Sequence, residues 1–395
     1  MPNSPQIVQR LWNFCDVLRD DGVSYGDYVE QLTYLLFLKM DQERRQLGKS
    51  SAIPDPYRWE RLLKDENGNK LKGNDLESQY RKTLQALQGQ GGMIGIIFGK
   101  AQNRIQNPAR LRRLIDYINE ETWMAIDADV KGDIYEGLLE KNAQDTKSGA
   151  GQYFTPRPLI RAMVRAVRPS PDQTIADPAC GTGGFFLAAK DHIIGNHNLT
   201  RDQKEDLRDK TFRGWEIVDN TARLCTMNLY LHGIGPREIS DDEDPPVVVQ
   251  DSLVSPPDDR YYVVLTNPPF GKKSSFTIIN EAGESETQTH TYEREDFWTS
   301  TSNKQLNFLQ HVANMLTIGG TAAIVVPDNV LFEGGAGETV RKRLLNQYEV
   351  HTLLRLPTGI FYAQGVKANV LFFDRRPASE TPWTETLWIY DLRTN

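Results

Sequence analysis

The run Asn267-Pro268-Pro269-Phe270 combines residue types that suit methyl transfer to a planar amino nitrogen. Such a nitrogen, as in adenine, is a poor nucleophile because its lone pair is delocalised into the ring. The Asn267 side-chain oxygen and the Pro268 carbonyl can accept its two hydrogens, since proline offers an acceptor and no competing N–H. Pro269 stiffens the turn, and Phe270 offers a flat face for a base taken out of its stack. Taken alone, the tetrapeptide also fits an ordinary proline turn after a strand.

A second motif lies upstream, where a short predicted strand, residues 174–176, leads into Asp177-Pro178-Ala179-Cys180-Gly181-Thr182-Gly183. A glycine-rich turn between a strand and a helix lets the backbone approach a ligand closely. The G-x-G-x-x-G spacing of dinucleotide sites is absent, because Phe186 stands where the third glycine would fall. Asp177 suits an ammonium group better than a pyrophosphate, which favours S-adenosylmethionine as the ligand.

Two further predicted strands also end in acidic residues. Residues 212–217 contain Glu216, which can accept from both ribose hydroxyls, and residues 247–252 contain Asp251, which can accept from the adenine amino group of the cofactor. Three strands ending in acids, and a fourth ending in Asn267, predict one ligand-binding edge of a parallel sheet.

With these motifs in this order, nearly the whole chain resembles the modification (M) subunits of type I restriction–modification systems, a family of N6-adenine DNA methyltransferases. The resemblance implies that Tyr153, Phe154 and Thr155 lie over the methionine end of the cofactor. It also implies that Asp177, Gly181 and Gly183 cradle the cofactor. The full set of cofactor-binding residues that it implies is Gln152, Tyr153, Phe154, Thr155, Pro156, Asp177, Pro178, Ala179, Cys180, Gly181, Thr182, Gly183, Glu216, Asp251 and Ser252.

The resemblance further implies the partners. They are double-stranded DNA, a specificity subunit that reads the DNA sequence, a second copy of this chain, and a motor and nuclease restriction subunit. This chain lacks a G-x-x-x-x-G-K-[ST] motif, so we do not expect it to be the motor. We expect no metal, because the sulfonium of the cofactor is already an activated electrophile. We expect no membrane association and a cytoplasmic location, because no apolar run reaches the roughly 18 residues that a span needs.

The length of 395 residues predicts two domains. Residues 1–150 show helical periodicity and no catalytic constellation, so we expect a helical assembly or DNA-contacting domain. Residues 151–395 alternate strands with helices. The expected fold is therefore α/β, a Rossmann-like S-adenosylmethionine-dependent methyltransferase sheet preceded by an all-α domain. The net charge of −7 predicts weak intrinsic affinity for DNA and a partner that supplies much of the DNA-binding energy.

Three local expectations concern the second half of the chain. Residues 271–302, poor in aliphatic side chains, predict a long mobile loop, with an insertion of no role as the alternative. Residues 306–316 predict a helix that Gly319-Gly320 ends. The few residues after the strand at 369–373 leave no room for a C-terminal target-recognition domain. Family members tend to continue there as a helical tail, so a short member and a truncated chain both fit.

Two other functions remain open at this point. The substrate could be another planar amide or amine, such as a release-factor glutamine or an RNA base, although those enzymes lack the N-terminal helical region and usually end the motif in tyrosine. The chain could also be a non-catalytic scaffold in a DNA-defence complex, against which the intact Asn267, Asp177 and Glu216 argue.

Overall fold

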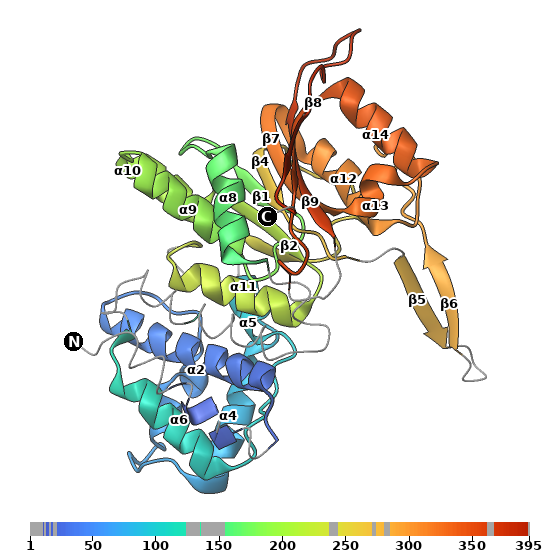
Figure 1. Cartoon of the computed structure of the whole chain (residues 1–395). Coiled ribbons are helices and arrows are strands. Elements are labelled where there is room, and N and C mark those ends of the chain that lie inside the picture. The colour runs from blue at the N-terminus through green and yellow to red at the C-terminus, as the bar shows by residue number, and fades with distance from the viewer. Residues whose placement is uncertain are drawn as a thin grey trace. The chain divides into compact units, whose positions relative to one another are not determined.

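The computed structural model comprises two compact units, of which the first contains residues 1–148 and 218–249 and the second residues 149–217 and 250–395 (Figure 1). The structure describes residues 11, 13–15, 17–18, 22–123, 135, 155–236, 244–270, 274–279, 285–361 and 367–393. The first unit groups residues 218–249 with the N-terminal helices, so the units interleave along the sequence and do not meet at one boundary near residue 150.

The first unit is mainly helical, as its periodicity predicts. Its longest helix, α2, begins after Ser24, whose hydroxyl accepts a hydrogen bond from the Asp27 N–H at 3.1 Å. This is the N-cap arrangement that satisfies a free helix N–H. The described elements of this unit are α2 (Tyr25–Gln46), η1 (Asp55–Tyr57), α3 (Glu60–Leu63), α4 (Gly73–Leu87), α5 (Gly92–Phe98), α6 (Pro108–Glu120), α11 (Asp219–Leu231) and β3 (Val247–Val249).

A buried arginine explains why α11 belongs with these helices. The Arg223 side chain, 4% exposed, pairs with Glu30 at 3.2 Å. It donates to the Ile97 carbonyl at 2.7 Å, and its guanidinium lies 5.2 Å from the centre of the Tyr34 ring. A buried charge needs partners of this kind, because leaving it unpaired in a low-dielectric interior is costly. Leu224, Met227 and Leu231 of α11 join the same apolar core.

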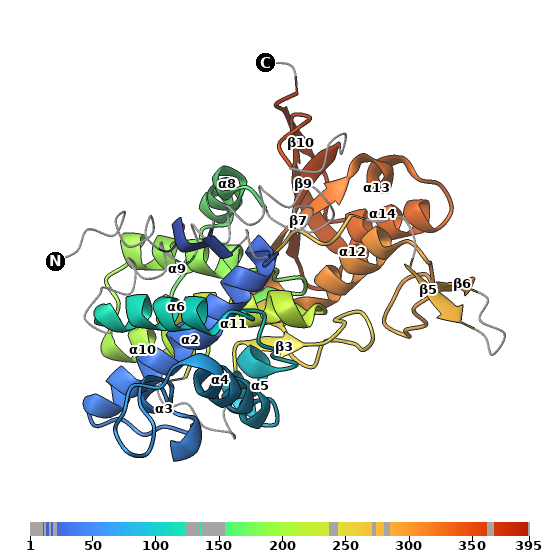
Figure 2. The same cartoon turned by 90° about the horizontal axis from the view of Figure 1, so that it is seen from below.

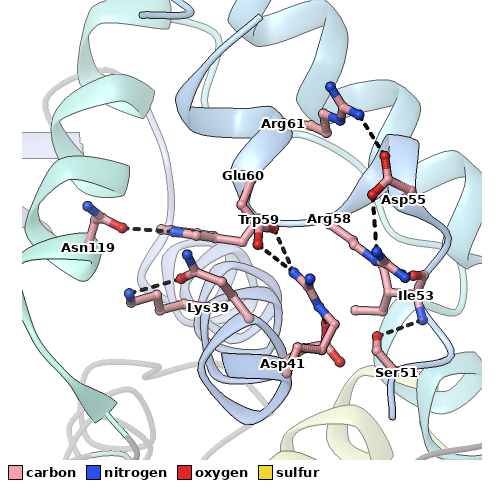
Figure 3. A network of polar contacts seen from close by, with 12 residues as sticks. Lys39, Asp41, Ser51, Ile53, Asp55, Arg58, Trp59, Glu60, Arg61 and Asn119 are labelled. Carbon is pink, nitrogen blue, oxygen red and sulfur yellow. Dashed lines mark hydrogen bonds and ion pairs between the residues drawn. The ribbon is translucent and has the colours of Figure 1, made fainter. Parts of the chain in front are cut away.

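A polar network ties the ends of several helices of this unit together (Figure 3). Arg45 of α2 donates from one nitrogen to both carboxylate oxygens of Glu60, each at 2.7 Å. The Trp59 indole N–H donates to the Asn119 side chain at 2.9 Å, and Arg61 pairs with Asp55 at 2.6 Å. Trp59 is fully buried, so its bond to Asn119 satisfies the one polar atom of that side chain.

The second unit is a sheet with helices on both sides. Its strands follow the order β10-β8-β9-β7-β4-β1-β2, and α8 and α9 lie on one side with α12 and α14 on the other (Figures 1 and 2). The described elements are α8 (Arg157–Val167), β1 (Ile175–Asp177), α9 (Gly184–Asn196), α10 (Arg201–Asp209), β2 (Phe212–Glu216), β4 (Tyr261–Thr266), β5 (Ser274–Ile279), β6 (Ser285–His290), α12 (Lys304–Met315), β7 (Leu316–Pro327), α13 (Asp328–Phe332), α14 (Ala336–Gln347), β8 (Tyr348–Arg355), β9 (Ala368–Arg375) and β10 (Trp388–Asp391).

The strands that carry the motifs are parallel, whereas β9 runs antiparallel to both of its neighbours. β1 pairs in parallel with β2 and with β4, and β4 pairs in parallel with β7. β9 pairs antiparallel with β7 and with β8. A parallel neighbour requires a crossover segment, usually a helix, and no helix is described between β8 and β9, which favours the antiparallel pairing.

Two expectations about residues 271–320 are wrong. The segment at 271–302 is not one long loop, because it contains β5 and β6, which form an antiparallel ribbon with Ser274 opposite His290. Gly319 and Gly320 do not end the preceding helix: α12 stops at Met315, and both glycines lie within β7. A side chain at Gly320 would come within 2.9 to 3.0 Å of three backbone oxygens, so close strand approach explains that glycine.

The helices in the described part of the chain include none that is long and apolar enough to cross a membrane.

A close contact at Gly214 in β2 generates the first prediction. A Cβ atom there would lie 2.8 Å from the Phe186 ring and 2.9 Å from the Cys180 side chain. Gly214→Ala should therefore lower the free energy of unfolding by about 1–3 kcal/mol, typical of overpacking. Gly195→Ala in α9 is the control, because a Cβ there meets nothing within 4 Å and alanine favours a helix. Denaturant titration measures both, and equal stability of the two variants would contradict the packing described.

Candidate active site

Three of the predicted site residues lie at one edge of the sheet. Asp177 is the last residue of β1, Glu216 is the last of β2, and Asn267 follows the end of β4. Because β1 pairs in parallel with both β2 and β4, the carboxyl ends of the three strands lie side by side. The three residues that were predicted to share one edge of the sheet therefore do so.

The loop after β1 folds back onto β2. Gly181 and Gly183 have φ angles of 55° and 83°, which glycine adopts without strain. The Gly181 N–H donates to the Glu216 carboxylate at 3.2 Å, and the Cys180 N–H donates to the Trp215 carbonyl at 2.9 Å. The Cys180 side chain is 5% exposed and packs near Gly214, so it fills the turn. The loop therefore fixes the position of the Glu216 carboxylate.

Asp177 is a buried carboxyl group with 1% exposure. Burial raises the pKa of Asp177 to about 7, and the charge of Glu216 acts in the same direction. The Ala179 N–H, which donates to Asp177 at 3.0 Å, opposes this rise by stabilising the charged form. A cation placed here would replace the hydration that the carboxylate has lost.

Asp251 and Ser252 lie beside these residues. The Gln250 N–H donates to the Glu216 carbonyl at 3.1 Å, which places Asp251 next to the end of β2. The Ser252 hydroxyl is buried and donates to the Pro178 carbonyl at 2.8 Å, so it braces the loop after β1. One Asp251 oxygen accepts from the Leu253 N–H at 3.0 Å and the other from the Tyr292 hydroxyl at 2.6 Å.

The Asn267 amide has a hydrogen-bond partner at its nitrogen but none at its oxygen among the residues that the structure describes. Its nitrogen donates to the Thr155 hydroxyl at 2.9 Å. Its oxygen is buried and has no hydrogen-bond partner among the residues that the structure describes. An orphaned buried acceptor costs about 1–3 kcal/mol, so it needs an explanation. A bound donor group would supply one.

Two side chains from other segments contact the rest of the Asn-Pro-Pro-Phe turn. The Gln305 side chain, 2% exposed at the start of α12, donates to the Pro269 carbonyl. The Phe270 and Phe361 rings meet edge to face, with centroids 5.3 Å apart and planes at 77°. Pro268 is buried. Gln305 and Phe361 thus join the site as support residues.

The remaining predicted site residues fall into two groups. Pro178, Ala179 and Thr182 belong to the loop between β1 and α9, and Pro156 immediately precedes α8. Gln152, Tyr153 and Phe154 lie outside the described residues. Three side chains that sequence reasoning missed are Tyr292, Gln305 and Phe361. No sequence pattern links Tyr292 or Gln305 to the site.

The site fits S-adenosylmethionine by the chemistry of its donor set. A buried carboxylate suits an ammonium group, two glycines with positive φ let the backbone approach a ligand, and a second carboxylate on the next strand suits a diol. In the described ranges, no group of three His, Cys, Asp or Glu side chains could hold a metal ion.

Comparisons with known proteins agree with this donor set. Residues 126–395 match the family described as N-6 DNA Methylase, and residues 7–118 match the HsdM N-terminal domain. The chain is 41% identical to the type I restriction enzyme StySJI methylase subunit of Salmonella typhimurium, over all of this chain and 72% of that protein. It is 40% identical to the EcoKI methylase subunit of Escherichia coli K12, with the same coverage.

Solved structures give the same result. A chain from a structural study of complex assembly in the type I R-M system has a TM-score of 0.79 and 28% identity, covering 99% of this chain and 77% of that one. The crystal structure of the EcoKI M protein has a TM-score of 0.53 and 35% identity, covering 98% of this chain and 72% of that one.

The fold and the site define an S-adenosylmethionine-dependent methyltransferase. The chain belongs to the N-6 DNA methylase family, as a relative of the methylase subunits of type I restriction enzymes, and is an adenine-specific DNA methyltransferase. Membership of a type I system implies a DNA substrate and other subunits. The matches do not favour the release-factor, RNA or scaffold alternatives.

Burial of Asp177 generates a prediction about pH. Its folded-state pKa of about 7 lies above the unfolded value of roughly 3.9, so the folded state binds more protons between these values. Stability of the ligand-free protein should therefore fall as pH rises through that window. Asp177→Asn removes this titrating group. The free energy of unfolding of the variant, relative to that of the wild type, should therefore increase as pH rises from 5 to 7, by at most about 1.4 kcal/mol per pH unit.

Chemical denaturation at pH 5, 6, 7 and 8 measures this difference. Above pH 7 the two profiles should become parallel, because the carboxyl is ionised in both states. Profiles that stay parallel over the whole range would show that Asp177 titrates at an ordinary pH.

Proposed function

We propose that Asn267 and the Pro268 carbonyl receive the two amino hydrogens of an adenine flipped out of double-stranded DNA. The observation that carries this proposal is the buried Asn267 oxygen, which lacks a partner among the described residues while the amide nitrogen is held by Thr155. The contact with Thr155 holds the amide in place, and in this proposal its oxygen faces the base. Accepting both hydrogens pushes the nitrogen toward tetrahedral geometry and frees its lone pair.

Phe270 supplies the stacking surface for that base in this proposal. Its edge contact with Phe361 limits rotation of the ring, so the face on which a base would lie is set in advance. Gln305 keeps the Pro269 carbonyl in place, which orients the neighbouring Pro268 carbonyl. Catalysis of this kind depends on positioning and electrostatics more than on a titrating base.

The cofactor roles follow from the same sheet edge. Asp177 pairs with the ammonium group of the cofactor, Glu216 accepts from the ribose hydroxyls, and Asp251 with Ser252 lies at the adenine. Gly181 holds Glu216 through its N–H, so the turn and the ribose site form together. By the resemblance to M subunits, Tyr153, Phe154 and Thr155 would contact the methionine end, and Gln152 and Pro156 would complete that cofactor-binding segment. When bound, S-adenosylmethionine supplies an activated methyl group on its sulfonium.

Site selection belongs to other chains in this proposal. The net charge of −7 provides little general attraction to DNA phosphates. A specificity subunit would select the site and hold two copies of this chain, and a restriction subunit would add the motor and nuclease. The helical first unit, residues 1–148 with 218–249, supplies assembly and DNA contacts, and the second unit supplies the chemistry. The complex would act in the cytoplasm, where its DNA substrate lies.

Asn267→Ala tests the chemical role. The variant should bind S-adenosylmethionine within a few-fold of the wild type, because Asn267 faces the base. It should transfer methyl groups at least roughly a hundredfold more slowly, the scale for losing one transition-state hydrogen bond. Calorimetry measures the affinity for the cofactor. Incorporation of tritiated methyl groups into duplex DNA, with the specificity subunit present, measures the transfer rate.

Asn198→Ala is the matched control for this experiment, because Asn198 is exposed and lies outside every motif. It should leave both the cofactor affinity and the methyl-transfer rate unchanged. A near-normal transfer rate in Asn267→Ala would remove Asn267 from the mechanism.

The isolated chain should bind the cofactor but bind DNA weakly and without sequence preference. Its charge offers few phosphate contacts, and no sequence-reading module is assigned to it. Methylation at a defined site should appear only when a specificity subunit is added. Methyl incorporation into matched duplexes with and without that subunit measures this, and efficient site-specific methylation by the chain alone would refute the division of labour.

A further inference from the structure

The Tyr292 side chain lies against the proposed adenine site. Tyr292 follows β6 and is 7% exposed. Its hydroxyl donates to one oxygen of the Asp251 carboxylate at 2.6 Å, although the two residues are 41 positions apart in the chain. A short bond to a carboxylate is a charge-assisted hydrogen bond, about twice as strong as a neutral one.

The Asp251 carboxylate is thereby fixed at both oxygens. The Leu253 N–H occupies one lone pair of the first oxygen at 3.0 Å, and Tyr292 occupies one of the second. Each carboxylate oxygen has two acceptor positions, so acceptor capacity remains for a ligand. The two bonds restrict rotation of the carboxylate and so set the direction in which that capacity points.

Arg294 anchors the segment that carries Tyr292. It donates to the Leu253 carbonyl at 3.3 Å and to the Asp296 carboxylate at 2.8 and 2.6 Å. It also donates to the ring nitrogen of His311 in α12 at 3.0 Å. Burial lowers the pKa of His311 to about 3, so the ring is neutral and can accept that bond. Arg294 and Tyr292 therefore both form hydrogen bonds with the same segment, residues 251–253.

We infer that Tyr292 is a positioning residue that aims the Asp251 carboxylate at the exocyclic amino group of the cofactor's adenine, and so contributes to recognition of that base. The inference rests on the role proposed above for Asp251. It assigns a function to a side chain in the segment that the sequence suggested was a mobile loop. In this role the Tyr292 hydroxyl acts through Asp251, so loss of the hydroxyl should affect recognition of the amino group and leave binding of the rest of the cofactor unchanged.

Calorimetry with two ligands tests this directly. The first ligand is S-adenosylhomocysteine, and the second is its analogue with hydrogen in place of the 6-amino group. The wild type should prefer the first by roughly tenfold or more, as expected for one hydrogen bond to a charged acceptor. Tyr292→Phe should reduce this preference several-fold while leaving affinity for the analogue unchanged. Tyr262→Phe is the control, because Tyr262 in β4 is 44% exposed.

The double variant Asp251→Ala/Tyr292→Phe completes a thermodynamic cycle. If Tyr292 acts through Asp251, the tyrosine change should have no further effect on the preference once Asp251 is gone. Thermal unfolding of every variant confirms that the proteins are folded at the assay temperature.

The outcomes separate this inference from the proposed function. If Asp251→Ala keeps the full preference for the amino group, Asp251 does not bind the cofactor's adenine. The roles proposed for Asp251 and for Tyr292 would then both be wrong. If Asp251→Ala abolishes the preference and Tyr292→Phe keeps it, the role of Tyr292 alone is overturned. If Tyr292→Phe weakens both ligands equally, the tyrosine supports only the fold, which also overturns the inference.

Discussion

The three residues of β1 are the constraint on which the site depends. This strand is completely buried and pairs in parallel with a neighbour on each side. Parallel pairing aligns the carboxyl ends of the strands, and so brings Asp177, Glu216 and Asn267 to one edge. A strand that short has little stability of its own, so the packing of both neighbours must hold it in place.

The sequence predicted the parts of this arrangement that local chemistry encodes. Strands that are buried on both faces consist of runs of aliphatic residues, which the sequence shows directly. The acidic residues and Asn267 at the ends of these runs can be identified in the same way. The glycine turn after Asp177 was equally visible, since positive φ angles at Gly181 and Gly183 require that residue type. Because both signals depend on near neighbours in the chain, one sequence was enough to interpret them.

The features that the sequence did not predict depend on contacts between distant segments. Arg223 looks like any helix arginine until its pairing with Glu30 places α11 in the first unit. Tyr292 sits in a polar stretch, and only folding brings it to Asp251. Gly320 resembled a helix terminator, because the backbone oxygens that exclude a side chain belong mainly to another strand. Tertiary contacts of this kind leave no periodic signal.

The interleaving of the two units has a consequence for dissecting the protein. The backbone passes from one unit to the other at residues 148/149, 217/218 and 249/250. The last two passages lie one residue after Glu216 and one residue before Asp251. No single cut can therefore release either unit whole. A fragment that begins at residue 126 would carry α11 without its helical partners and expose Leu224, Met227 and Leu231 to water. Separate expression of the two family regions should therefore yield insoluble or unstable fragments.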